Sequence, residues 1–192
     1  MNKKIVSILS ILLCAYLGMA WVYPYSFFSI QKDVSFHSDE MVVQTYNHEL
    51  HEFRKIHEGN SRKDLVNERT DYIIQLYEQN WLTSEKNVTI YHYDLDTMLN
   101  QVKNTRYWLL ELAFVDGYTQ EAKEYLKLNI EQCMALEAKI MAMQNATFDS
   151  KTELNKQLKN LQNQFKFSLN VYTSFYKEYL AGNKLEIMLP SK

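Results

Sequence analysis

The chain has 192 residues, of which 46% are hydrophobic and 14% aromatic, and its formal net charge is −2. This much apolar material can build a core, so the composition excludes a disordered tail, and the length suits one domain of ordinary size. Lys and Arg are scattered along the chain and almost balanced by acidic residues. Nucleic-acid binding therefore has no electrostatic footprint and is excluded as a function.

The first 23 residues form the most distinctive stretch of the chain. Lys3 and Lys4 precede an apolar run from Ile5 to Tyr23, and about 20 apolar residues are enough to cross the hydrocarbon core of a bilayer. Basic residues beside a membrane span favour the cytoplasmic side. The sequence therefore predicts a cytoplasmic N-terminus (residues 1–4), a transmembrane signal anchor (5–23) that attaches the protein to the membrane, and an extracytoplasmic C-terminal domain.

Two other interpretations of this segment stay open. Gly18-Met19-Ala20 loosely matches the small-x-small pattern of a signal-peptide cleavage site, which would release a secreted protein beginning at Trp21. Lipidation at Cys14 is the weaker alternative, because Leu13 occupies the position at which a bacterial lipobox has a small residue.

An aromatic juxtamembrane connector follows over residues 24–37. We expect its side chains either to lie in the lipid headgroup zone or to fold back on the domain, because exposed aromatic patches are costly in water. The apolar residues concerned are Tyr25, Phe27, Phe28, Ile30 and Phe36.

Helices should dominate the rest of the chain, which contains only four glycines and two prolines in all. A first helix beginning at Ser38 or Asp39 is predicted by four apolar residues at helical spacing, and a second apolar run up to Trp81 follows a cap formed by Ser61 with Asp64. Periodicity leaves open whether 39–81 is one kinked helix or two. The four residues of the first stripe are Val43, Tyr46, Leu50 and Phe53.

Three longer helices are predicted next, over about 94–116, ended by Gly117, then 119–146 and 150–181. The last begins with the capping box Ser150-Lys151-Thr152-Glu153. Helices joined by short turns run antiparallel, so the sequence predicts an all-α fold in which residues 38–181 form an antiparallel four- to five-helix up-and-down bundle, followed by a C-terminal tail over 182–192. An extended coiled-coil hairpin is the alternative.

A minor two-stranded ribbon is also predicted. Residues 88–93 and 185–189 both alternate apolar and polar side chains, and the two segments are expected to pair with each other.

Motifs for catalysis are absent from the sequence. His48 and His51 are three residues apart, whereas the zinc-protease helix motif needs four, and no glutamate is followed three residues later by histidine as a di-iron helix bundle requires. We therefore predict no catalytic residue, cofactor, metal site or small-molecule substrate. A metal-dependent enzyme that uses His48 and His51 with carboxylates from other helices is kept as a weaker alternative. Cys133 is expected to be a small buried apolar residue rather than an intermolecular bridge.

An aromatic cluster near the end of the last helix is the candidate partner surface. Tyrosine is enriched at interfaces, although the spacing of the cluster suits core packing as well. Its residues are Tyr172, Phe175, Tyr176 and Tyr179. Glu111 lies in a nearly apolar window, and it is interpreted either as a buried functional acid or as a residue that faces solvent or pairs with a neighbouring helix.

These observations predict a non-enzymatic module for protein interaction, an accessory or structural protein that is tethered to a membrane. Its expected partner is another envelope or membrane protein. A secreted helical effector, released after Ala20, is the alternative.

Overall fold

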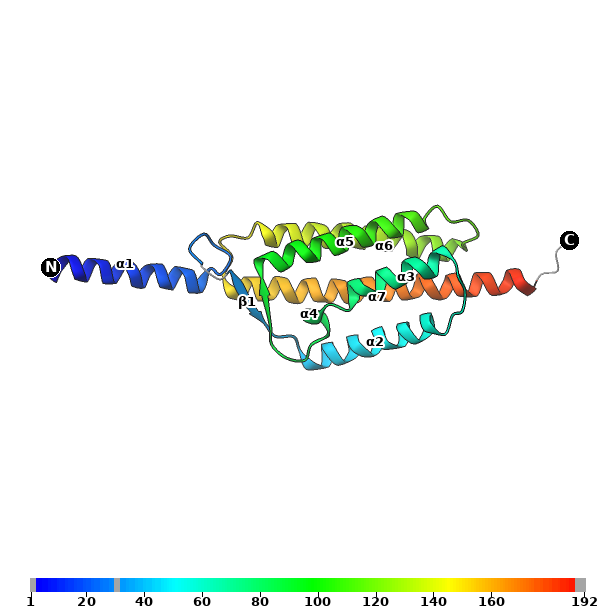
Figure 1. Ribbon diagram of the computed structural model, residues 1–192, viewed down its shortest axis with the longest axis horizontal. Coiled ribbons are helices and arrows are strands. Elements are labelled where there is room, and N and C mark those ends of the chain that lie inside the picture. The colour runs from blue at the N-terminus through cyan, green and yellow to red at the C-terminus, as the bar shows by residue number, and fades with distance from the viewer. Residues whose placement is uncertain (1–2, 30–31, 189–192) are drawn as a thin grey trace.

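The computed structural model describes residues 3–29 and 32–188, and this part of the chain is mostly helical (Figure 1). The predicted predominance of helices is therefore confirmed, and a small two-stranded antiparallel sheet is present as well. In chain order the elements are α1 (Lys3–Val22), β1 (Asp33–Phe36), α2 (Glu40–Glu58), α3 (Leu65–Tyr77), α4 (Asn80–Thr83), β2 (Val88–Tyr91), α5 (His92–Leu112), α6 (Gln120–Gln144) and α7 (Lys151–Met188).

Helix α1 projects away from all the other elements (Figure 1). It is 20 residues long, its mean hydropathy is high, and none of its residues is buried. A helix of this length and composition can cross a bilayer, and a signal sequence near the N-terminus has the same properties. The structure thus provides one apolar N-terminal helix that suits either role.

The remaining elements, residues 33–188, form what we call the helical body. Helix α6 packs between α5 and α7, α3 packs on α5, and α2 contacts α3, α4 and α7. The connection between α5 and α6 lies at the end of the helical body away from α1, whereas the connection between α6 and α7 lies beside α1 (Figure 1).

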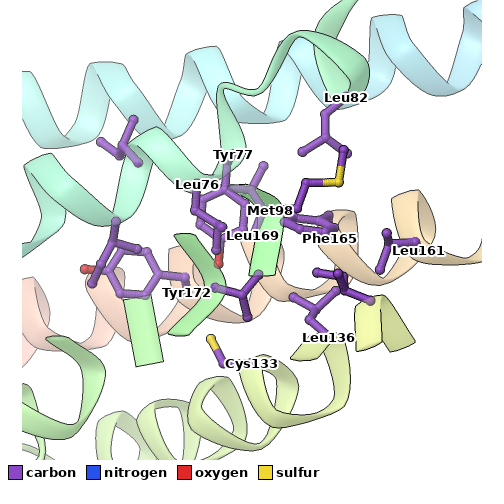
Figure 2. Close-up of a cluster of buried hydrophobic side chains, with 14 of the residues drawn as sticks. Leu76, Tyr77, Leu82, Met98, Cys133, Leu136, Leu161, Phe165, Leu169 and Tyr172 are labelled. Atoms are coloured by element: carbon purple, nitrogen blue, oxygen red, sulfur yellow. The ribbon is translucent and has the colours of Figure 1, made fainter. Parts of the chain in front are cut away.

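Helix α7 supplies the largest share of the core. Its buried residues recur at steps of three and four, so one stripe of the helix faces the other elements. Figure 2 shows Phe165, Leu169 and Tyr172 of this stripe meeting Tyr77 from α3 and Cys133 from α6. Burying each large apolar side chain contributes about 1.5–3 kcal/mol. The full stripe is Leu154, Leu158, Leu161, Phe165, Leu169, Tyr172, Phe175, Tyr176 and Tyr179.

The segment 39–81 contains two main helices rather than one kinked helix. Asp39 caps α2 by accepting hydrogen bonds from the backbone N–H groups of Met41 and Val42, and the apolar stripe predicted for this helix is buried. The cap of α3 is Asp64, whose carboxylate accepts from the Asn67 N–H at 3.0 Å. The prediction of Ser61 as the capping residue was therefore wrong.

The two-stranded sheet was predicted with the wrong partner. Strand β2 pairs with β1, in the register Asp33 to Tyr91 and Phe36 to Val88, and residues 185–188 belong to α7. Residue 189 of the predicted strand lies outside the described residues. An alternating pattern over five residues is too short to separate a strand from a helix. The sheet is stabilised by the inward-facing side chains of Val34 and Phe36, both 1% exposed.

Two helix ends also differ from the predictions. Helix α5 ends at Leu112, before Gly117, which instead adopts a φ of 88° within the connection to α6. Helix α7 continues to Met188, so part of the expected tail over 182–192 is helical. The start of α7 agrees with the predicted cap, since the Ser150 hydroxyl accepts from the Glu153 N–H.

Candidate functional site

The predicted partner surface on α7 is buried. Tyr172, Phe175 and Tyr176 are 0% exposed, and Tyr179 is 7% exposed. Their spacing of three and four residues places all of them on the stripe that faces the core. These four residues therefore belong to the core, and Tyr179 alone of them also lines a surface cleft.

The hydroxyl groups of Tyr176 and Tyr179 are satisfied by residues from α2, α3 and the connection between them. The Tyr176 hydroxyl donates to Asn67 Oδ1 at 2.6 Å, accepts from Asn60 Nδ2 at 3.0 Å, and lies 3.0 Å from His57 Nδ1. Tyr179 donates to the carboxylate of Asp64. Burial raises the pKa of the Tyr176 phenol. These contacts tie the end of α7 to the connection between α2 and α3.

The histidines of α2 form no metal site in the described residues. His48 and His51 are exposed, and no group of three or more His, Cys, Asp or Glu side chains in the described part of the chain is placed to hold a metal ion. His57 is the histidine that makes structural contacts. Its Nε2 lies 2.6 Å from Asp71 Oδ1, and its Nδ1 contacts Tyr176.

Cys133 is buried in the core, as predicted. Burial raises the pKa of its thiol to about 12, so the thiol stays protonated at neutral pH and is a poor nucleophile.

Two clefts open at the end of the helical body away from α1, which we call the far end and define as residues 59–65 and 113–119. A cleft of about 490 Å³ runs along the start of α3, with Arg62, Glu68 and Asp71 among its lining residues. A second, of about 200 Å³, is lined by Arg62, Tyr118, Tyr179 and neighbouring residues. Arg62 borders both clefts.

Tyr118, which lines the second cleft, carries a buried hydroxyl group that lacks a hydrogen-bond partner within the described residues. Its ring packs edge-on against Phe175 at 5.5 Å between centroids, and burial raises the pKa of its phenol. A buried hydroxyl without a partner favours a ligand group that supplies one.

A second apolar stripe runs along the outside of α5 toward this end. Tyr107, Leu110 and Phe114 are 61%, 37% and 87% exposed. Tyr107 and Leu110 lie three residues apart on one side of α5, whose opposite side is buried against the core, and Phe114 lies in the turn that follows the end of the helix at Leu112. We call these three residues the outer face of α5. Exposed aromatic and apolar side chains gathered on one face are typical of interaction sites.

Two contacts between α3 and α5 involve residues of α5 that are adjacent in sequence to the outer face. The rings of Tyr72 and Trp108 stack with centroids 5.2 Å apart, and Arg69 Nε donates to Glu111 Oε2 at 2.6 Å. Glu111 thus pairs with a neighbouring helix, which was one of the two interpretations of this residue. The hydrogen bond with Glu111 favours the charged form of the Arg69 guanidinium and so raises its pKa.

Sequence reasoning did not select the outer face of α5, although the signal was present. Tyr107 and Leu110 are apolar and lie three residues apart, which is helical spacing. The smaller cleft of the far end had no sequence signal, because it is lined by residues from three separate parts of the chain.

Comparisons with protein-family models, with curated proteins and with solved structures found no match.

Proposed function

We propose that this protein is a membrane-tethered extracytoplasmic module that acts by binding another protein and has no enzymatic activity. The observation that carries the proposal is the outer face of α5, an exposed apolar stripe on a helix whose other side already fills the core. Aromatic anchors of this kind dominate the energetics of protein interfaces.

The arrangement of the molecule supports a tether at one end and a binding site at the other. Helix α1 leaves one end of the helical body, and the outer face of α5 reaches the far end (Figure 1). We propose that α2, α3, α5, α6 and α7 form an antiparallel up-and-down bundle, because short connections join α5 to α6 and α6 to α7. Such a bundle would present its far end to the solvent away from the membrane.

Polar groups at the far end would add specificity to the apolar contact. Arg62 borders both clefts, and the Tyr118 hydroxyl lies in the smaller one. Arginine and tyrosine are enriched among the residues that contribute most to binding. The expected partner is therefore a folded envelope or membrane protein with an apolar patch and a hydrogen-bonding group beside it.

The orientation follows from the charges that flank α1. Lys3 and Lys4 precede its apolar run, and the positive-inside rule places them in the cytoplasm. A C-terminal alkaline phosphatase fusion should be active outside the cytoplasm, and detergent rather than alkaline carbonate should be needed for extraction. Release of a mature form that begins at Trp21 would instead show a secreted protein.

Site-specific photocrosslinking in intact cells tests the binding face. A photoreactive phenylalanine at Tyr107 and another at Phe114 should give the same adduct, and Leu110→Asp should reduce both. The matched control is Met134 on α6, which is 57% exposed and should give no such adduct. Absence of adducts at Tyr107 and Phe114, or equal labelling from Met134, would contradict the proposal.

A further inference from the structure

The segment between α1 and β1 folds back along α1. The ring of Phe28 packs edge-on against Tyr16 with centroids 6.3 Å apart, and Phe27 packs on Phe28 at 6.1 Å. Tyr16 lies six residues before the end of α1 at Val22, which corresponds to about 9 Å along the helix axis. Phe28 is therefore level with the last two turns of α1 rather than beyond its end.

The same segment has a second side that faces the helical body. Tyr25 is 2% exposed, its hydroxyl donates to the Ile90 carbonyl at 3.3 Å, and its ring packs edge-on against His92. Phe27, two residues later, is 92% exposed. Tyr25 thus anchors the segment to the helical body, while Phe28 packs against α1 and Phe27 is exposed.

The connection between α6 and α7 adds a residue from a distant part of the sequence. The Lys151 ammonium lies 5.2 Å from the centroid of the Trp21 ring, so the start of α7 is beside the last turn of α1. Phe148, three residues before Lys151, is 75% exposed. Three residues span at most about 11 Å, so Phe148 lies within that distance of the start of α7, in the connection that lies beside α1 (Figure 1).

We propose that Trp21, Phe27, Phe28 and Phe148 form an aromatic collar that inserts into the lipid interface at the C-terminal end of α1 and seats the helical body directly on the membrane. This rests on the proposed function, in which α1 remains in the bilayer. A 20-residue helix is about 30 Å long, which matches the hydrocarbon core, so rings beside its last two turns are at the depth of the acyl chains and headgroups.

The chemistry of the collar suits the lipid interface rather than water or protein. Aromatic rings concentrate at the level of the headgroups, and lysine side chains extend from there to the phosphates. Lys151 occupies the corresponding position beside Trp21. The proposed partner is therefore the boundary between headgroups and acyl chains.

Depth-dependent fluorescence quenching tests the collar in the full chain. A cysteine labelled with an NBD fluorophore is placed at Phe27, at Phe148 or at Phe114, in a Cys14→Ala background in which buried Cys133 is not labelled. Each protein is reconstituted into phosphatidylcholine vesicles that carry a spin label near the headgroup. Phe114 is the matched control, because it is 87% exposed but lies at the far end.

Labels at positions 27 and 148 should be quenched several-fold more strongly than the label at 114, with emission shifted to shorter wavelength. Quenching at 27 and 148 no stronger than at 114, in protein that alkaline carbonate does not extract, would overturn the collar but leave the tether intact. Quenching at 27 alone would also overturn the collar, because it would exclude Phe148. Extraction by carbonate would overturn the tether and the collar together.

Discussion

The two ends of the helical body are built from different kinds of contact. Beside α1, the exposed aromatic rings of Phe27 and Phe148 carry no hydrogen-bonding groups, and the Lys151 ammonium lies over the ring of Trp21. At the far end, tyrosine hydroxyls meet asparagine, histidine and aspartate side chains, as at Tyr176 and Tyr179. The first kind of surface suits an environment that provides no hydrogen bonds, and the second suits water and a polar partner.

The two ends differ in polarity although they share one continuous hydrophobic core. The stripe of α7 runs through the helical body, and the groups that surround its two ends differ in polarity. A network of satisfied polar groups specifies geometry more strictly than apolar packing does, because each unpaired buried group is costly. The far end should therefore be the more sensitive to small chemical changes.

The largest expected effect comes from removing a core ring near the far end. Phe175 is fully buried and packs against Tyr118 and Tyr172. Phe175→Ala should lower the free energy of unfolding by about 3–5 kcal/mol, because it leaves a cavity, as measured by urea denaturation. Phe167→Ala is the control on the same helix, since Phe167 is 49% exposed. Equal losses in the two variants would contradict the assignment of Phe175 to the core.

Alkaline pH should destabilise the protein through its buried tyrosines. Burial raises the pKa of Tyr46, Tyr77 and Tyr172 above the ordinary value of 10.0. Below pH 10 these phenols are protonated in both the folded and the unfolded states, so stability is unaffected. Above it the unfolded state loses protons that the folded state keeps, and stability should fall by about 1.4 kcal/mol per pH unit for each tyrosine.

Denaturation curves between pH 8 and pH 11 measure this loss, and absorbance near 295 nm reports ionisation of the phenols. Early ionisation of all tyrosines, without unfolding, would contradict their burial.

The polar network at the far end should respond to the loss of one oxygen atom. Tyr176→Phe removes a hydroxyl that contacts Asn67, Asn60 and His57, and it should cost about 1–3 kcal/mol because buried polar groups lose a partner. Tyr25→Phe is the comparison at the end beside α1, where the substitution removes the 3.3 Å hydrogen bond from the Tyr25 hydroxyl to the Ile90 carbonyl. A larger loss for Tyr25→Phe than for Tyr176→Phe would reverse the contrast between the two ends.

The smallest expected effect concerns the backbone of the connection between α5 and α6. Gly117 has a φ of 88°, a conformation that residues with a Cβ atom avoid. Gly117→Ala should destabilise the protein by about 1 kcal/mol, measured as a shift in the denaturation midpoint. Asp116→Ala, at the exposed neighbouring position, should leave the midpoint nearly unchanged.

Local sequence patterns were sufficient to predict the helices and their buried residues, but not the contacts between segments that are distant in the sequence. The apolar spacing of α2 identified Val43 and Phe53 as core residues, and both are buried. The pairing of β2 could not be derived, because the partner of a short strand is chosen by packing between distant segments. Strand β1 lies 55 residues before β2, counted from Asp33 to Val88, and nothing in either strand specifies the other.

The candidate site was missed for a related physical reason. The spacing of Tyr172, Phe175 and Tyr176 on α7 and that of Tyr107 and Leu110 on α5 are equally helical, yet the first set is buried and the second exposed. Periodicity identifies residues that share a face, whereas the neighbouring helices decide which face is covered. Only the tertiary structure separates a core stripe from a binding face.

The length of α7 has a consequence for where the protein can act. Its 38 residues form a rod of about 57 Å, and it begins beside Trp21 at the last turn of α1. If the tether and the collar hold that beginning at the lipid surface, α7 serves as a molecular ruler. The height at which a partner is met would then be set by the number of turns in one helix, so inserting or deleting whole turns would move the meeting point by about 5 Å per turn.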